Sequence, residues 1–229
     1  MNELLSIAAF PVALTLAAFR IGMACQKKFR LPIFNPILIA MALVVGFSLL
    51  TGMPISQYKL GMNTISWLMT PATISMAIPM YQQFRILKKS MPAILAGVAA
   101  GTVTCLAFLL VCCGLLGFEQ SLTVSMLPKS VTTAIGVSLS DMFGGMGAVT
   151  TAAIIISGIL ANMMGANFCK WFGITDQVAQ GVAFGTAGHV IATAKANELS
   201  ELIGAVSSLS LVVAGLLTAV LFPIVVTFL

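Results

Sequence analysis

Apolar runs of about twenty residues follow one another along nearly the whole chain, and this pattern restricts the fold most. A helix needs about 20 apolar residues to cross the ~30 Å hydrocarbon core of a bilayer. We expect spans near residues 4–24, 33–51, 61–82, 91–115, 120–140, 146–169, 178–197 and 203–228. The prediction is an all-α, polytopic membrane helical bundle of about eight spans, with residues 1–229 forming a single integral membrane domain.

Charged side chains are too scarce to cover a water-soluble surface. They make up 7% of the 229 residues, while 59% of the residues are hydrophobic and the mean hydropathy is +1.09. Soluble domains carry roughly 25% charged residues. The lipid bilayer is therefore the first expected partner. No polybasic tail and no mixture of basic and aromatic residues indicates nucleic-acid binding, so the net charge of +5 reflects membrane topology.

Basic residues are concentrated after the first and third predicted spans. They are Arg20, Lys27, Lys28 and Arg30 in one region, and Arg85, Lys88 and Lys89 in the other. The positive-inside rule makes this side cytoplasmic and places both termini outside. A re-entrant segment would invert the C-terminal half. The first span begins with an acid and has no basic n-region, so we expect a retained helix and not a signal peptide.

Three of the spans contain residues that interrupt membrane helices. The third has Pro71 and Pro79, the fifth has "LPKS" at 127–130, and the seventh, "GVAFGTAGHVIATAKANE" (181–198), holds the only histidine. Proline removes a helix hydrogen bond, and the freed groups must be satisfied by protein or by cavity water. Transporters use such broken helices at their binding sites. We expect discontinuous or re-entrant helices, with proline kinks or close helix packing as the alternative.

The fifth span places a lysine in apolar sequence. An ammonium in hydrocarbon costs at least ~2.5–3.5 kcal/mol, so Lys129 needs a partner, a water-filled cavity or a ligand. If a half-helix begins at Pro128, Ser130 is able to cap it. The residues that would then share one helix face are Lys129, Thr132, Thr133 and Gly136. An ammonium, hydroxyls and free backbone N–H groups form a site for a small anion, and a carboxylate fits it best.

The seventh span carries two stripes at helical spacing. The polar stripe consists of Thr186, His189, Thr193 and Asn197, and the small-residue stripe of Gly181, Gly185, Gly188 and Ala192. The small residues suit close helix packing. His189 is either a donor to carboxylate, a proton relay or a satisfied core histidine. Lys195 and Glu198 lie three residues apart and either form an ion pair at the interface or take part in substrate binding and proton coupling.

Two long segments resemble the signatures of a known family. "LPKSVTTAI" (127–135) and "GTAGHVIATAKANE" (185–198) are similar to segments of the LrgB/CidB family, and "FNPILIA" (34–40) resembles a third. The similarity covers essentially the whole chain. It departs at Ala134, where the family often has proline, at Ala192, where it often has glycine, and at Lys195, where it often has arginine. Lysine lacks the bidentate fork of arginine, so affinity or selectivity is expected to differ if position 195 binds substrate.

The resemblance implies a function. The family includes antiholin-like bacterial proteins, regulators of murein hydrolase export and a plastid-envelope glycolate/glycerate carrier, and some bacterial members are linked to pyruvate movement. We therefore expect a secondary transporter of small 2-hydroxy or 2-oxo monocarboxylates. The alternative is an antiholin-like membrane protein that affects murein hydrolase export and autolysis. The resemblance also implies the bacterial cytoplasmic (inner) membrane, a smaller LrgA/CidA-type membrane partner and a homo-oligomer.

The matching positions define the candidate site. The expected substrate-binding residues are Lys129, Ser130, Thr132, Thr133, Thr186, Gly188, His189, Thr193 and Lys195. The residues expected to break or shape helices are Asn35, Pro36, Pro71, Pro128, Gly136 and Gly185, and those available for proton coupling or an ion pair are His189 and Glu198.

Nothing in the sequence favours an enzyme. Neither G-x-S-x-G nor H-E-x-x-H occurs, and the neighbours Lys129 and Ser130 do not form an obvious catalytic dyad. A membrane protease using His189 with a distant serine stays an alternative. The five cysteines lack C-x-x-C spacing, so we expect no metal, and no cofactor is indicated. Residues 1–115 and 119–229 are similar in length and are compatible with two related halves, although no simple duplication aligns their motifs.

Overall fold

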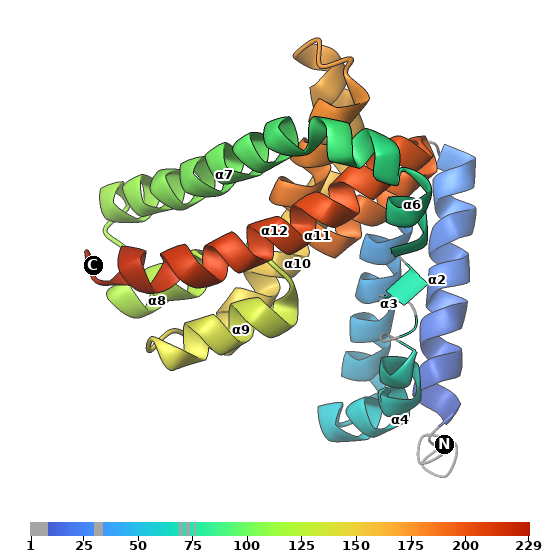
Figure 1. Ribbon diagram of the computed structural model, residues 1–229. Helices are drawn as coiled ribbons and strands as arrows, with labels where there is room; N and C mark the ends of the chain where they lie inside the picture. The colour runs from blue at the N-terminus through green and yellow to red at the C-terminus, as the bar shows by residue number, and fades with distance from the viewer. Residues whose placement is uncertain (1–8, 30–33, 69–70, 72–73, 76) are drawn as a thin grey trace. The chain divides into compact units, whose positions relative to one another are not determined.

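The computed structural model describes residues 9–29, 34–68, 71, 74–75 and 77–229, and the regular elements in these ranges are helices (Figure 1). The predicted all-α class is therefore confirmed. The chain divides into two compact units, Met1–Ser75 and Met76–Leu229.

The first unit contains three described helices, which are α2 (Ala9–Phe29), α3 (Pro36–Thr51) and α4 (Ile55–Trp67). A cap defines the start of α3, because the Asn35 side chain accepts a hydrogen bond of 2.9 Å from the Ile37 N–H. Pro36 occupies the first turn, where its missing N–H leaves no bond unmade. At Gly22, α2 approaches α3 so closely that a Cβ atom would lie 2.6 Å from the Pro36 carbonyl oxygen.

The second unit holds the remaining helices. They are α6 (Ala77–Gln82), α7 (Phe84–Leu115), α8 (Gln120–Met126), α9 (Thr133–Met142), α10 (Gly147–Trp171), α11 (Gln177–Leu199) and α12 (Glu201–Val226). Helix α11 packs against α10, α12 and α7, and α7 lies beside α12 (Figure 1). One core cluster joins Leu87, Ile94 and Val98 of α7 to Ala205, Val206 and Ala214 of α12.

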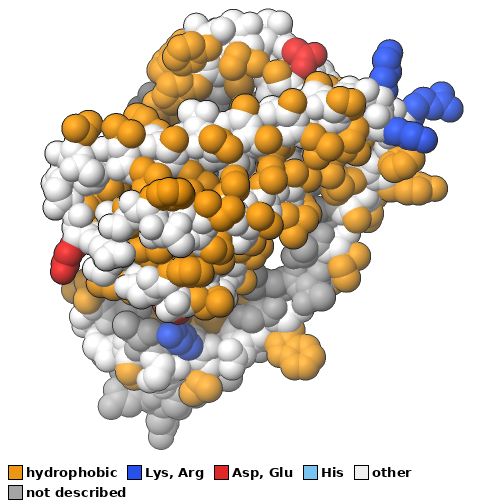
Figure 2. Space-filling model, turned by 60° about the vertical axis from the view of Figure 1, so that its left-hand side comes forward, with side chains coloured by type: hydrophobic (Ala, Val, Ile, Leu, Met, Phe, Trp, Pro, Cys, Tyr) orange, Lys and Arg blue, Asp and Glu red, His pale blue; other side chains and the backbone are white. Residues whose placement is uncertain are grey.

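Four helices in the described part are long and apolar enough to cross a membrane: α2, α7, α10 and α12. Helix α3 is apolar but shorter. Hydrophobic side chains cover much of the face in Figure 2, and charged ones are few there. The chain is a multi-pass membrane protein.

The third and fifth of the expected spans are each divided between two described helices, in agreement with the predicted discontinuous helices. In place of the third, α4 ends at Trp67 and α6 begins at Ala77, with Pro71 in the interval. In place of the fifth, α8 and α9 are separated by residues 127–132. In the fifth span the interruption includes Pro128, which cannot continue the helical hydrogen-bond ladder; in the third span, residues 69–70, 72–73 and 76 lie outside the described part of the chain.

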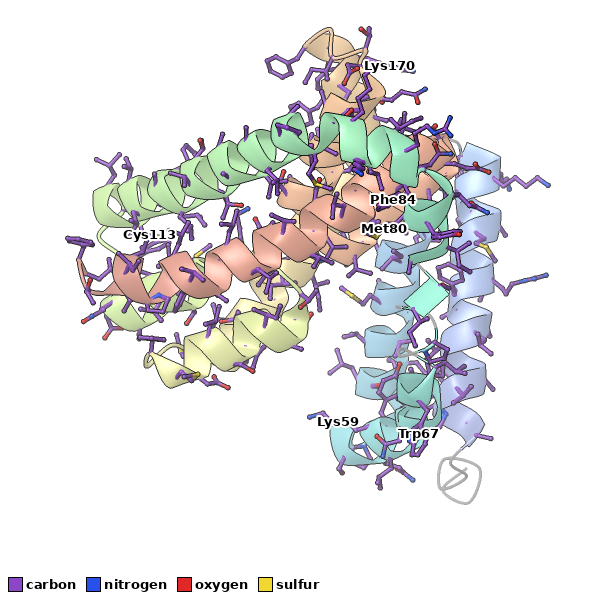
Figure 3. The ribbon with its side chains drawn as sticks, in the orientation of Figure 1. Lys59, Trp67, Met80, Phe84, Cys113 and Lys170 are labelled. Carbon is purple, nitrogen blue, oxygen red and sulfur yellow. The ribbon has the colours of Figure 1, made fainter. Side chains whose placement is uncertain are left out.

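The basic residues of the predicted loops lie within helices, except Arg30, which lies outside the described residues. Lys27 and Lys28 form part of the last turn of α2. Helix α7 begins at Phe84, earlier than expected, and thus includes Arg85 and the two lysines that follow. Lys170 likewise lies near the end of α10 (Figure 3). Long basic side chains reach the polar interface from a helix end while their stems stay in apolar surroundings, so helices extend past the apolar run.

The half-helix of the fifth span starts later than predicted. Its first residue is Thr133 and Thr132 occupies the N-cap position, so the predicted start at Pro128 is wrong. Lys129 and Ser130 precede the helix, and Ser130 is not its cap. Consequently Lys129 does not share a helical face with Thr133. Gly136, which is buried, lets α9 approach α10 because a Cβ there would lie 2.6 Å from Ile154 Cδ1.

The small-residue stripe of α11 packs as predicted. A Cβ at Gly181 would lie 2.6 Å from Val206 Cβ of α12. At Gly185 a Cβ would overlap the backbone oxygen of Ser207, also on α12. On the other side, a Cβ at Gly188 would overlap Ala161 of α10. The absence of side chains at these positions therefore allows α11 to pack between two apolar helices.

We expect Gly185→Ala to destabilise the protein by about 1–3 kcal/mol, because the added methyl group meets backbone and cannot be accommodated by a side-chain rotation. Thermal unfolding of the purified protein in detergent measures the effect. Gly114→Ala is the matched control, since no atom lies within 4 Å of its Cβ position and alanine favours the helix. Equal melting temperatures for the two variants would contradict the close packing of α11 on α12.

Candidate functional site

The breaks in the fifth and seventh spans both contact the middle of α10. The backbone oxygen of Ile154 accepts a hydrogen bond of 2.9 Å from His189 Nε2, which therefore carries the proton. One turn later, the Ser157 hydroxyl lies 3.0 Å from the backbone oxygen of Lys129, to which it donates. Because α10 is long enough to span a bilayer, both breaks lie at membrane depth. The backbone oxygen of Lys129, which no helical hydrogen bond uses, thus has a protein partner, as hydrocarbon requires.

His189 produces the break in α11. Its backbone has φ 43° and ψ −139°, and it is the one non-glycine residue with positive φ in the described part of the chain. The side chain is 4% exposed and packs over Gly158, where a Cβ would lie 2.7 Å from Nε2. The Thr193 hydroxyl donates to the His189 backbone oxygen at 2.7 Å, and Ser207 Oγ lies 2.8 Å from Thr193 Oγ1. His189 is thus a buried histidine whose contacts hold a strained kink.

Two cavities flank the first half of α11. One, of about 530 Å³, lies between α10 and α11. The other, of about 740 Å³, lies between α7 and α11. Lys129, Ala183 and Ala187 line both of them, and Lys129 is the cation in both sets of lining residues. We call them the α10 cavity and the α7 cavity.

The α7 cavity gathers polar groups from both signature segments. The Lys129 ammonium donates to the Ser130 hydroxyl at 3.2 Å, and Ser130 Oγ lies 3.3 Å from Cys105 Sγ. Thr186 and Thr104 also line this cavity. The Thr186 hydroxyl donates to the Val182 backbone oxygen at 2.7 Å, so its oxygen is available as an acceptor. The tertiary structure therefore brings Lys129, Ser130 and Thr186 together.

The remaining predicted binding residues do not line either cavity. Thr132 is the N-cap of α9 and Thr133 is exposed. Gly188, His189 and Thr193 are buried in packing contacts. The Lys195 ammonium forms an ion pair of 2.8 Å with Glu198, near the end of α11. These residues differ from the first three because their side chains face neighbouring helices or the exterior rather than a cavity.

Sequence reasoning missed the contribution of α7. Thr104 and Cys105 line the α7 cavity, together with Gly97 and Gly101. The two glycines allow α11 to come close, because a Cβ at Gly101 would lie 3.4 Å from Thr186 Oγ1. The signal was present in "AGVAAG" (96–101) as a small-residue face, although such a face predicts packing and not a cavity. Asp176, the N-cap of α11, lines the same cavity.

Lys129 forms no ion pair within the described residues, where the one salt bridge is Lys195–Glu198; Asp176 lines the same α7 cavity but is not within ion-pair distance of the ammonium. Lys129 is partly buried, its ammonium donates to the Ser130 hydroxyl, and the residue lines both cavities. Cavity water or an anionic ligand is therefore what offsets the cost of placing this charge at membrane depth. The arrangement is suited to binding a small anion through one ammonium and adjacent hydroxyls.

Comparison with known proteins gives one family. Residues 15–228 match the model of the LrgB-like family. No solved structure matches the chain significantly. The match includes both units and all the residues that line the two cavities.

We expect His189→Gly to be more stable than His189→Ala by about 1 kcal/mol, although alanine is normally the better helix former. Both variants remove the imidazole, so the difference reports the cost of positive φ for a residue with a Cβ. Paired thermal unfolding curves measure it. If the alanine variant is the more stable, the strained backbone at position 189 is contradicted.

We expect Cys105 to react with an anionic methanethiosulfonate reagent roughly fivefold faster in the protein with Lys129 than in the Lys129→Met variant. The reason is that a nearby ammonium contributes about 1 kcal/mol of attraction. Labelling rates in proteins that retain one cysteine measure this, with a cationic reagent showing the opposite change. Cys112, on the same helix outside the α7 cavity, is the control whose rate should stay constant. If Lys129→Met leaves the labelling rate of Cys105 unchanged, the thiol and the ammonium are not close to each other.

Proposed function

This chain belongs to the LrgB-like family, and on that premise we propose that it is a secondary transporter of small 2-hydroxy or 2-oxo monocarboxylates, of the glycolate, glycerate and pyruvate class. It acts in the bacterial cytoplasmic membrane and is not an enzyme. The observation that carries the proposal is Lys129, a partly buried ammonium at membrane depth that faces two cavities and has no acidic partner in the described part of the chain.

The chemistry of the α7 cavity fits this substrate class. A carboxylate beside Lys129 neutralises the charge and accepts a charge-assisted hydrogen bond, which is stronger than a neutral one. Ser130, already within 3.2 Å of the ammonium, donates a second hydrogen bond. The Thr186 oxygen accepts from a 2-hydroxyl group, because its own proton is used by Val182. The Thr104 hydroxyl is available to a 2-oxo group.

The broken helices supply the movement that transport needs. Transporters commonly move one part of the bundle against another around a site at discontinuous helices. Here residues 127–132 join α8 to α9 outside the regular helices, and Lys129, the proposed carboxylate anchor, belongs to this connection. A change in the conformation of the α8–α9 connection therefore directly changes the access of substrate to the Lys129 ammonium. A proton-coupling role of His189 or Glu198 stays a prediction.

The alternative, an antiholin-like membrane protein that affects murein hydrolase export, makes no use of a carboxylate site. A smaller LrgA/CidA-type partner and a homo-oligomer are part of the proposal in either case. Saturable, stereoselective uptake separates the two functions, since a pore has neither property.

We expect proteoliposomes with the wild-type chain to take up labelled glycolate, D-glycerate or pyruvate, and Lys129→Met to lower uptake by at least about tenfold, the effect of losing a hydrogen bond to a charged group. Uptake with and without a pH gradient is the measurement. Lys195→Met is the matched control, because an exposed ion pair contributes little. Saturable uptake by folded Lys129→Met at the wild-type rate would contradict the proposal that Lys129 binds the substrate carboxylate. If the folded wild-type protein takes up none of these acids, transport either depends on the partner protein or the chain has the alternative, antiholin-like function.

A further inference from the structure

The α10 cavity differs from the α7 cavity in its lining. Its walls are formed by apolar side chains, including Leu160, Met164, Phe168, Phe172 and Phe184. Its polar side chains are few, and one of them, the Ser157 hydroxyl, is within hydrogen-bonding distance of the backbone oxygens of Lys129 and Ile154. The lining of this cavity is therefore mainly apolar with one lysine, Lys129, and its residues Leu160, Phe168 and Phe172 are themselves exposed.

The position of these residues along α10 gives the cavity a direction. Ser157, next to Lys129, lies near the middle of α10, whereas Phe168 and Phe172 lie at its end. Ile174, in the connection between α10 and α11, also lines the cavity. The distance along α10 from Ser157 to Phe168 is about 16 Å at 1.5 Å per residue. Lys129 thus lies at the inner end, and the aromatic rings lie toward the outer end.

The small acids of the proposed function have no apolar group that would fill such a space. Ligand pockets commonly measure about 300–1,000 Å³ and are mainly apolar with a few polar groups that fix orientation. The α10 cavity, at about 530 Å³, has this size and composition. Phenylalanine rings and a methionine sulfur favour an aromatic guest, because edge-to-face ring contacts and sulfur–aromatic contacts add to apolar burial.

We propose that the α10 cavity is a second binding site, for monocarboxylates with an aromatic body such as phenylpyruvate, whose carboxylate pairs with Lys129 while the ring lies among Met164, Phe168 and Phe184. The inference rests on the proposed role of Lys129 as carboxylate anchor. Because one ammonium serves both cavities, an aromatic acid and a small acid exclude each other. The protein therefore binds small acids in the α7 cavity and aromatic acids in the α10 cavity, and the Lys129 ammonium pairs with the carboxylate of either class.

Two substitutions separate the cavities. Met164 lines the α10 cavity and Ala100 lines the α7 cavity, and neither lines the other. Met164→Trp fills the α10 cavity, and Ala100→Trp fills the α7 cavity. Calorimetric titration of the purified protein with phenylpyruvate, with glycolate and with the neutral phenylacetamide compares the three ligands.

The expected result is a crossed pattern. Met164→Trp should raise the ratio of the phenylpyruvate Kd to the glycolate Kd at least tenfold, and Ala100→Trp should lower it. Lys129→Met should abolish binding of both acids, glycolate should displace phenylpyruvate, and phenylacetamide should not bind.

Three results would overturn the inference. Lys129-dependent binding of glycolate without binding of phenylpyruvate removes the second site and leaves the proposed function intact. Equal binding of phenylpyruvate and phenylacetamide shows an apolar pocket in which Lys129 has no role. A ratio unchanged by Met164→Trp, in protein that unfolds at the wild-type temperature, places the aromatic acid elsewhere. Phenylpyruvate binding that requires Lys129 and is weakened by Met164→Trp, in the absence of any glycolate binding, keeps this site and rejects the small-acid function.

Discussion

The absence of water in a bilayer core governs the second unit of this protein. Every backbone group freed by a helix break must find a partner within the protein, and every charge needs a cavity or a counter-charge. Residues 154–158 of α10 meet part of this requirement for both breaks. Ile154 accepts from His189, Ser157 lies in hydrogen-bonding range of the Lys129 backbone oxygen, and Gly158 leaves room for the imidazole. Without this segment, neither interrupted helix would be stable at membrane depth.

Small residues allow the helices around residues 154–158 to pack closely. Gly136 brings α9 onto Ile154, and Gly185 and Gly188 hold α11 between α12 and α10. In membranes, such close approach provides van der Waals packing that hydrophobic transfer does not supply between apolar helices. The result places a lysine, a histidine and two helix breaks within a few turns of one helix. The cavities on either side of α11 form where the chain has glycine or alanine instead of larger side chains, as at Gly97, Gly101 and Ala187.

Lys129 and Lys195 show why a charge in a signature segment is not by itself a site. Both belong to segments that resemble the same family, and both were expected to bind substrate. Lys195 pairs with Glu198 one helical turn away, and its side chain is 31% exposed. Lys129 has no such neighbour in sequence, and the fold surrounds its ammonium with cavities. The difference in environment makes Lys129 the residue on which the proposed chemistry depends.

The membrane class, the helical fold, the family and the segments that contain interruptions could all be predicted from the sequence, because hydropathy, proline and small-residue spacing act locally. The sequence also indicated Lys129 and Ser130, since an ammonium in an apolar run is unfavourable wherever the segment lies. The folded structure was needed to show that α9 begins at Thr133, that His189 supports a kink and that α7 contributes Thr104 and Cys105. These features depend on contacts between helices distant in sequence, and no local pattern specifies which face of a helix meets a cavity.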